Sequence, residues 1–109
     1  MSETALQKHI QDGLEKLGYW VIRTARSKKR GFKSINTGED GMPDLCLPAL
    51  GWGEVKLPGK ELEPDQIAWH ARAHRHGIRT GVWHSLEEAL RDAMAWSGQR
   101  AGSAGKLAG

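Results

Sequence analysis

Residues 41–56, which read GMPDLCLPALGWGEVK, constrain the fold of this chain more than any other stretch. Short apolar and β-branched runs at 45–47 and 53–57, separated by a Pro- and Gly-containing turn, predict two neighbouring β-strands. A hairpin of these strands would bring Asp44, at the start of the first, next to Glu54 on the second. The chain is therefore expected to build its sheet around a pair of carboxylates.

Lys56 follows Glu54 at the i+2 position, so a strand would present both side chains on one face. Two converging carboxylates repel each other unless a cation lies between them or one takes up a proton. Hard oxygen ligands favour Mg²⁺ or Mn²⁺, and the lysine would then orient a water or stabilise charge on a phosphate. Glu-x-Lys triplets are common, however, and a surface ion pair on an amphipathic strand is the alternative.

The rest of the chain predicts an α/β fold in which a mixed sheet is flanked by helices. The expected elements are a helix over 3–17, a strand over 19–24, a helix over 65–76, a strand over 78–83 and a helix from Ser85 to about Trp96. In the second helix, Ile67, Ala71 and His74 are expected to share one face. Residues 1–96 would form the domain, and the glycine-rich segment 97–109 would be a flexible tail.

The composition fits one soluble domain of 109 residues. A single cysteine, Cys46, excludes an internal disulfide and a multi-cysteine zinc site. No apolar run approaches the roughly 18 residues that span a bilayer, and the N-terminus has no basic region followed by an apolar stretch. We therefore expect a cytoplasmic protein.

Positive charge is concentrated in one segment, although the net charge is only +3. Six cations and no acid occur within the eleven residues 23–33, namely Arg23, Arg26, Lys28, Lys29, Arg30 and Lys33. This segment would contact DNA phosphates, and a solvated charged loop is the alternative. Most of the five tryptophans are expected in the core or a dimer interface, whereas Trp52, beside the turn of the hairpin, is the one placed to stack on a base.

The order Gly-Met-Pro-Asp-Leu and then Glu-Val-Lys resembles the core of the PD-(D/E)XK nucleases. The continuation LPGKELEPDQIAWH over 57–70, with Gly77 before a strand, is similar to the VRR-NUC branch of that superfamily. The resemblance implies an αβββαβ core and a Mg²⁺- or Mn²⁺-dependent site that cuts DNA phosphodiesters.

The resemblance also assigns roles by position. It implies that Asp44 and Glu54 ligate the metal together with the backbone carbonyl of Val55, and that Lys56 is the catalytic lysine. Gln66 would support the site, and Glu3 would match the acid of the first helix, reaching the metal directly or through water.

Small proteins of this family resemble phage-encoded Holliday-junction resolvases, which act in DNA recombination and repair as homodimers. The leading prediction is therefore a metal-dependent endonuclease selective for branched DNA. A nickase, a flap or single-strand endonuclease with the same residues, a catalytically silent DNA-binding module and a partner-binding subunit of a replication complex are the alternatives.

Overall fold

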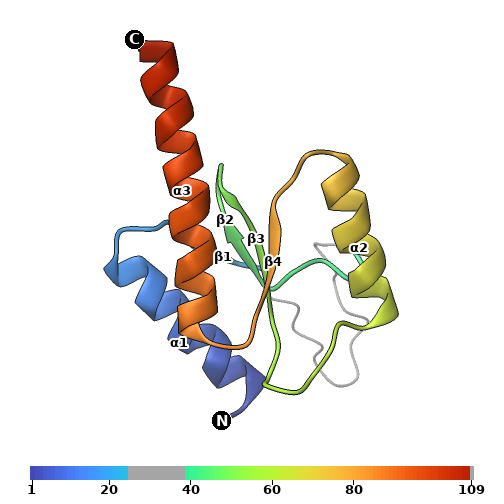
Figure 1. Cartoon of the computed structure of the whole chain (residues 1–109). Helices are drawn as coiled ribbons and strands as arrows, with labels where there is room; N and C mark the ends of the chain where they lie inside the picture. The colour runs from blue at the N-terminus through green and yellow to red at the C-terminus, as the bar shows by residue number, and fades with distance from the viewer. Residues whose placement is uncertain (25–38, 109) are drawn as a thin grey trace.

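The computed structural model describes residues 1–24 and 39–108, with side chains as far as Gly98 (Figure 1). The elements follow in the order α1 (Glu3–Lys16), β1 (Ile22–Arg23), β2 (Leu45–Leu47), β3 (Gly51–Val55), α2 (Pro64–Arg75), β4 (Thr80–Trp83) and α3 (Leu86–Ala108). This is the order predicted from the sequence, and the expected α/β class is confirmed.

The four strands form one mixed sheet in the order β1-β2-β3-β4. The β1–β2 and β2–β3 pairs are antiparallel, and β3 pairs with β4 in parallel. Because parallel neighbours need a crossover connection, α2 lies between β3 and β4 in the chain. The sheet stands between α1 and α3 on one side and α2 on the other (Figure 1), so it has two different faces.

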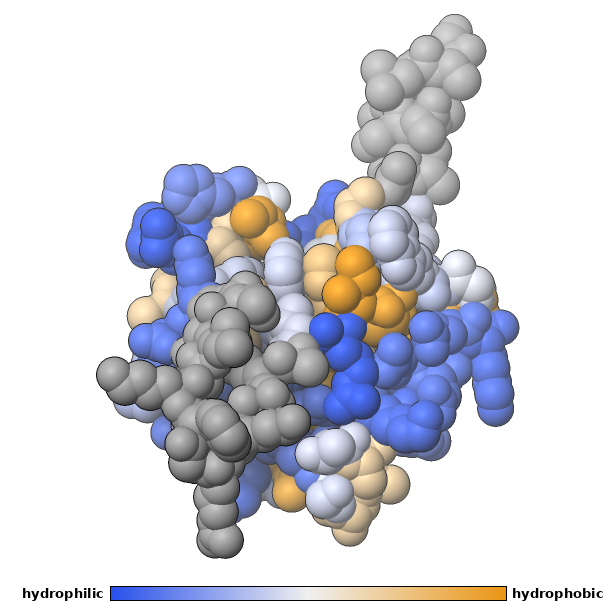
Figure 2. Space-filling model, turned by 180° about the vertical axis from the view of Figure 1, so that it is seen from behind, coloured by the Kyte–Doolittle hydropathy of each residue, from blue (hydrophilic) through white to orange (hydrophobic). Residues whose placement is uncertain are grey.

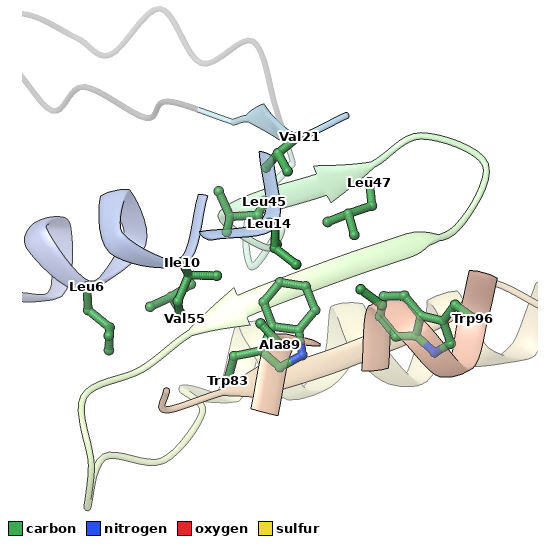
Figure 3. Packing of buried hydrophobic residues seen from close by; sticks show 11 residues of the cluster. Leu6, Ile10, Leu14, Val21, Leu45, Leu47, Val55, Trp83, Ala89 and Trp96 are labelled. Atoms are coloured by element: carbon green, nitrogen blue, oxygen red, sulfur yellow. The ribbon is translucent and has the colours of Figure 1, made fainter. Parts of the chain in front are cut away.

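The hydrophobic core fills the face covered by α1 and α3 (Figure 3). Residues at helical spacing on α1 and alternate residues of the strands supply it, which are Leu6, Ile10, Leu14, Leu45, Leu47, Val55 and Trp83, with Ala89, Ala93 and Trp96 from α3. Gly53 makes room for this packing, because a Cβ there would collide with the ring of Trp83. The Trp83 indole N–H donates to Asp92 at 2.9 Å, which satisfies its buried polar group.

Two helix starts agree with the sequence. The Ser2 hydroxyl accepts from the backbone N–H of Ala5 at 3.1 Å and caps α1. At α3 the Ser85 hydroxyl accepts from the N–H of Glu88 at 3.3 Å. The Glu88 carboxylate accepts from the N–H of His84 at 2.9 Å, whereas in a capping box it would accept from the N–H of Ser85. The hydrogen bond from His84, more than any other contact, lowers the pKa of Glu88.

The face of α2 that was expected to hold Ile67, Ala71 and His74 is turned to solvent. Ile67, Ala71 and His74 are exposed, whereas His70 and Ala73 are buried. The ring nitrogens Nδ1 of His70 and Nε2 of His74 both hydrogen-bond to the hydroxyl of Thr80 on β4, at 3.0 and 2.7 Å. A polar contact with the sheet, which apolar periodicity does not detect, therefore sets the rotation of this helix.

Three element boundaries also differ from the prediction. The first strand is shorter than residues 19–24, because its partner β2 has only three residues with which to pair. The third strand begins at Gly51, which pairs with Leu47, and ends at Val55. The last helix does not end near Trp96 but continues to Ala108 (Figure 1), in a sequence that contains no proline to stop it.

The surface on the side opposite to that of Figure 1 is mainly hydrophilic, with separate apolar patches (Figure 2). The largest exposed fractions among large apolar side chains belong to Met1, Trp20, Met94, Leu17 and Ile67. In the described residues no helix has the length and apolar character needed to cross a membrane.

Candidate active site

The carboxylate pair lies on the face of the sheet opposite the core. Along β3 the residues alternate, so Gly53 and Val55 face α1 and α3, while Trp52, Glu54 and the following Lys56 face the α2 side. The register pairs Leu45 with Gly53, which continues to Asp44 opposite Glu54. The hairpin thus brings together the two acids that the sequence places ten residues apart.

Pro43 shapes the open end of this hairpin. The same register would pair residue 43 with Val55 through two backbone hydrogen bonds, but proline has no N–H to donate. The Val55 N–H instead donates to the Asp44 carboxylate, with 2.9 Å between the nitrogen and Oδ2. The Pro43 carbonyl accepts from the Thr24 hydroxyl at 2.5 Å. The carbonyl oxygen of Val55 therefore receives no ladder donor from residue 43, and the Asp44 side chain is held in one orientation.

Among the titratable groups of the described residues, Glu54 has the most strongly shifted pKa. Its side chain is 1% exposed, and its Oε1 has no hydrogen-bond partner in the described structure. Burial first, and then the hydrogen bond and the negative charge of Asp44, raise the pKa of Glu54 to about 10. The cation of Lys56 acts in the opposite direction, and the charge of Glu3 adds a small upward effect.

These donors fit a divalent cation. A buried oxygen without a partner is rare in folded proteins and needs an explanation. Here it belongs to one of two adjacent carboxyl groups, beside a backbone carbonyl that lacks its ladder donor, and all are the hard oxygen donors that Mg²⁺ and Mn²⁺ prefer. The residues that would hold the ion are Asp44, Glu54 and Val55.

Glu3 and Lys56 occupy different positions relative to this pair. Glu3, half-buried in the first turn of α1, influences Glu54 through its charge. No group of three or more His, Cys, Asp or Glu side chains in residues 1–24 and 39–98 is close enough to hold a metal, so Glu3 does not complete a direct shell with the other two acids. Lys56 is only 7% exposed, and its backbone N–H donates to Trp83 at 3.0 Å, which fixes it beside Glu54.

Gln66 lies at the start of α2 and is bonded within its own helix cap. Its side-chain oxygen accepts from the N–H of Glu63 at 2.8 Å, which closes a capping box. Gly41 seats this helix start against the hairpin, since a Cβ at position 41 would collide with the carbonyl of Asp65 and lie 2.9 Å from the nitrogen of Gln66. Its φ of 80° also favours glycine. Gly41 and Pro43 are therefore structural parts of the site that the carboxylates alone do not reveal.

The predicted DNA-contacting segment is mostly outside the described residues, which exclude Arg26, Lys28, Lys29, Arg30 and Lys33. Arg23 is described, is exposed, and donates from Nη2 to the side-chain oxygen of Gln7 on α1 at 3.2 Å.

Comparison with known proteins gives one informative likeness. No family model matches the sequence, and no curated protein matches it. A solved structure described as a "VRR_NUC domain" superposes with a TM-score of 0.57 at 26% sequence identity, covering 82% of this chain and 90% of the other. The match agrees with the resemblance carried by the GMPD and EVK motifs. Fold and sequence pattern are therefore both similar to those of a VRR-NUC domain, which supports a nuclease of that type.

Proposed function

We propose that this nuclease domain is a Mg²⁺- or Mn²⁺-dependent endodeoxyribonuclease that prefers branched DNA. The observation that carries the proposal is the buried Glu54, whose partnerless oxygen lies beside Asp44 and on the same sheet face as Lys56. A fold with no need of a cation would have little reason to bury Glu54 beside a second acid, because keeping this carboxyl protonated at neutral pH costs stability.

The residues of the hairpin have different proposed roles in cleavage. Asp44, Glu54 and the Val55 carbonyl would hold the ion, which supplies an activated water and neutralises charge on the scissile phosphate. The hydrogen bond from the Val55 N–H keeps the Asp44 carboxylate in place. Lys56, held close to Glu54, donates hydrogen bonds to the phosphate oxygens or to the attacking water.

Gln66 and Glu3 are proposed to support the metal site without ligating the ion directly. Gln66 closes the cap at the start of α2, which Gly41 seats against the hairpin, so its removal would loosen the support of the carboxylates. Glu3 would act through a water, because its carboxylate influences Glu54 by charge without joining a three-acid cluster in the described residues.

A homodimer is the proposed working form. A four-way junction needs two symmetric cuts, and a dimer with a twofold axis supplies two sites in fixed orientation. The cations of residues 23–33 would contact phosphates on either side of the cut, with an affinity that falls steeply as salt increases.

The test is a cleavage assay on a four-way junction, a flap and a linear duplex, each with Mg²⁺, Mn²⁺ or EDTA. We expect cutting only with a divalent ion and faster cutting of the branched substrates. Asp44→Ala and Glu54→Ala should abolish cleavage, while Glu87→Ala, an exposed acid in the first turn of α3, should leave it unchanged. Cleavage that persists in EDTA or in either site variant would exclude the metal site. Equal rates on duplex and junction would exclude the preference for branched DNA.

The dimer is tested separately by sedimentation of the protein with and without an uncleavable junction. A complex with two protomers per junction is expected. One protomer per junction at saturating protein would contradict paired incision.

A further inference from the structure

A row of mostly apolar side chains crosses the sheet next to the carboxylates. The strand register aligns Ile22 with Cys46, Cys46 with Trp52, and Trp52 with Thr80. Residues paired across strands share a face, so this row lies on the same face as Glu54. Trp52 and Glu54 are two positions apart on β3, a separation of roughly 6.5–7 Å along an extended strand. A DNA strand that is bound at the carboxylates and runs along β3 towards the hairpin turn would therefore meet the indole of Trp52 within about one nucleotide.

A groove of about 260 Å³ opens beside this row, between the tip of the β2–β3 hairpin and the segment that connects α2 to β4. Cys46, Leu50 and Trp52 line it from the hairpin, and Ile78 and Arg79 line it from the connection. Ile78 is 40% exposed and Arg79 is exposed. The groove thus combines an aromatic ring, apolar walls and a cation, and its volume falls just below the roughly 300–1,000 Å³ of typical small-molecule pockets.

Trp52 is held in place before any ligand arrives. The ring of Trp69 on α2 packs edge-on against it, with 5.4 Å between the ring centroids and 61° between the planes. Trp69 is itself fixed, because its indole N–H donates to the Glu39 carboxylate at 3.1 Å. Trp52 lines the groove and Trp69 does not, so the two rings have different neighbours on their other sides. A ring immobilised in this way loses little entropy when a ligand stacks on it.

The size and the chemistry of the groove suit one base and not a duplex. Every nucleobase offers a planar face for stacking on an indole, and an arginine nearby contacts the flanking phosphate. A paired base inside a duplex cannot stack on the ring, because its faces are covered by its neighbours. We propose that the groove binds one unpaired nucleotide of the DNA strand, stacked on Trp52, next to the phosphodiester held at Asp44 and Glu54. The inference rests on the proposed nuclease function and specifies, among its branched substrates, those with unpaired nucleotides beside the cut, such as a flap.

Cys46 provides a test that needs no substitution, since it is the single cysteine of the chain and lines the groove. Burial raises the pKa of its thiol, so alkylation by iodoacetamide is followed at mildly alkaline pH, in EDTA, by mass spectrometry of the intact protein. We expect a saturating oligothymidylate to slow alkylation severalfold, and a fully paired duplex of equal length, at equal occupancy, to have little effect. Equal rates with and without the oligothymidylate would overturn the proposal. Protection that grows with protein concentration in the absence of DNA would assign the groove to a second copy of the chain.

A second test measures binding of labelled DNA by fluorescence anisotropy in EDTA. Trp52→Ala should weaken binding of a duplex with a short single-stranded flap roughly five- to a hundredfold, and Trp52→Phe should retain most of it, because a ring remains for stacking. The affinity for a fully paired duplex should stay the same. Trp20→Ala is the matched control, since Trp20 is 70% exposed and does not line the groove. Equal losses for the flap and the paired duplex, with native circular dichroism, would refute the stacking role.

Both tests are made without a divalent ion and without cleavage. A protein that cuts no DNA but shows Cys46 protection by unpaired thymidines would contradict the proposed nuclease function and leave the nucleotide groove standing. If the protein cuts DNA and Trp52→Ala leaves its affinity for the flap substrate unchanged, the nuclease function would stand and the nucleotide groove would be refuted.

Discussion

Replacing Glu54 by glutamine should make the metal-free protein more stable at neutral pH, although it removes a predicted catalytic residue. Glutamine is close in shape to a protonated carboxyl group and carries no charge. In the folded chain the pKa of Glu54 is raised from 4.5 to about 10, mainly by burial and then by Asp44. Ionisation therefore favours the unfolded state, and the stability contributed by the neutral carboxyl is complete below pH 4.5 and is lost as the pH rises towards 10.

The size of this stability loss follows from the number of pH units between the unfolded pKa of 4.5 and the working pH. Each pH unit above the unfolded pKa costs about 1.4 kcal/mol until the folded pKa is reached. Between 4.5 and pH 7 the loss is about 3 kcal/mol, which Glu54→Gln should avoid. For a domain of this size 1 kcal/mol moves the Tm by roughly 4–8 °C, so the variant should melt roughly 10 °C or more above the wild type at pH 7.

The assay is thermal unfolding followed by circular dichroism between pH 4.5 and 8, in EDTA and in Mg²⁺. In EDTA the Tm of the wild type should fall with rising pH relative to that of Glu54→Gln, and the two should converge near pH 4.5. Mg²⁺ should raise the Tm of the wild type but not that of the variant, because the ion binds the folded state through this carboxylate. Glu87→Gln, at an exposed acid, is the control. A variant that melts below the wild type at pH 7 in EDTA would refute the reasoning.

Two further predictions concern backbone positions of the hairpin. Pro43→Ala supplies an N–H opposite the Val55 carbonyl, and this N–H would compete with Mg²⁺ for the carbonyl oxygen. The concentration of Mg²⁺ that gives half of the thermal stabilisation should therefore rise roughly two- to tenfold, which corresponds to the free energy of one hydrogen bond. An unchanged Mg²⁺ titration would show that the carbonyl does not need to be free. Gly53→Ala places a methyl group against the buried ring of Trp83 and should lower the free energy of unfolding by about 1–3 kcal/mol in urea titrations. Gly98→Ala, where a Cβ would meet no atom within 4 Å, is the matched control and should be neutral or slightly stabilising.

The sequence was sufficient for the parts of the fold that depend on local patterns. The hairpin of β2 and β3 follows from two short apolar runs around a turn, and its register from the alternation that sends Leu45 and Leu47 into the core. Convergence of Asp44 and Glu54 is a direct consequence of that register. The order of elements was predictable for the same reason, because each helix and strand carries its own periodicity.

Features set by contacts between distant elements were not predictable. The rotation of α2 depends on hydrogen bonds of His70 and His74 to Thr80, which belongs to another element. The side-chain oxygen of Gln66 also caps its own helix by accepting from the N–H of Glu63, a contact that the family motif does not indicate. The aromatic row beside the carboxylates also depends on how three strands align, which no single segment encodes.

The hairpin and the parallel pairing of β3 with β4 have a consequence for the folding pathway. Asp44 and Glu54 are joined by a short turn and should meet early, since local hairpins close within microseconds. Burial of Glu54 must wait for the crossover through α2 that brings β4 alongside β3, a non-local step. We therefore expect its electrostatic cost to arise late in folding, when β4 has paired with β3. A bound divalent ion should accordingly lower the unfolding rate much more than it raises the folding rate. It would therefore stabilise the native state kinetically.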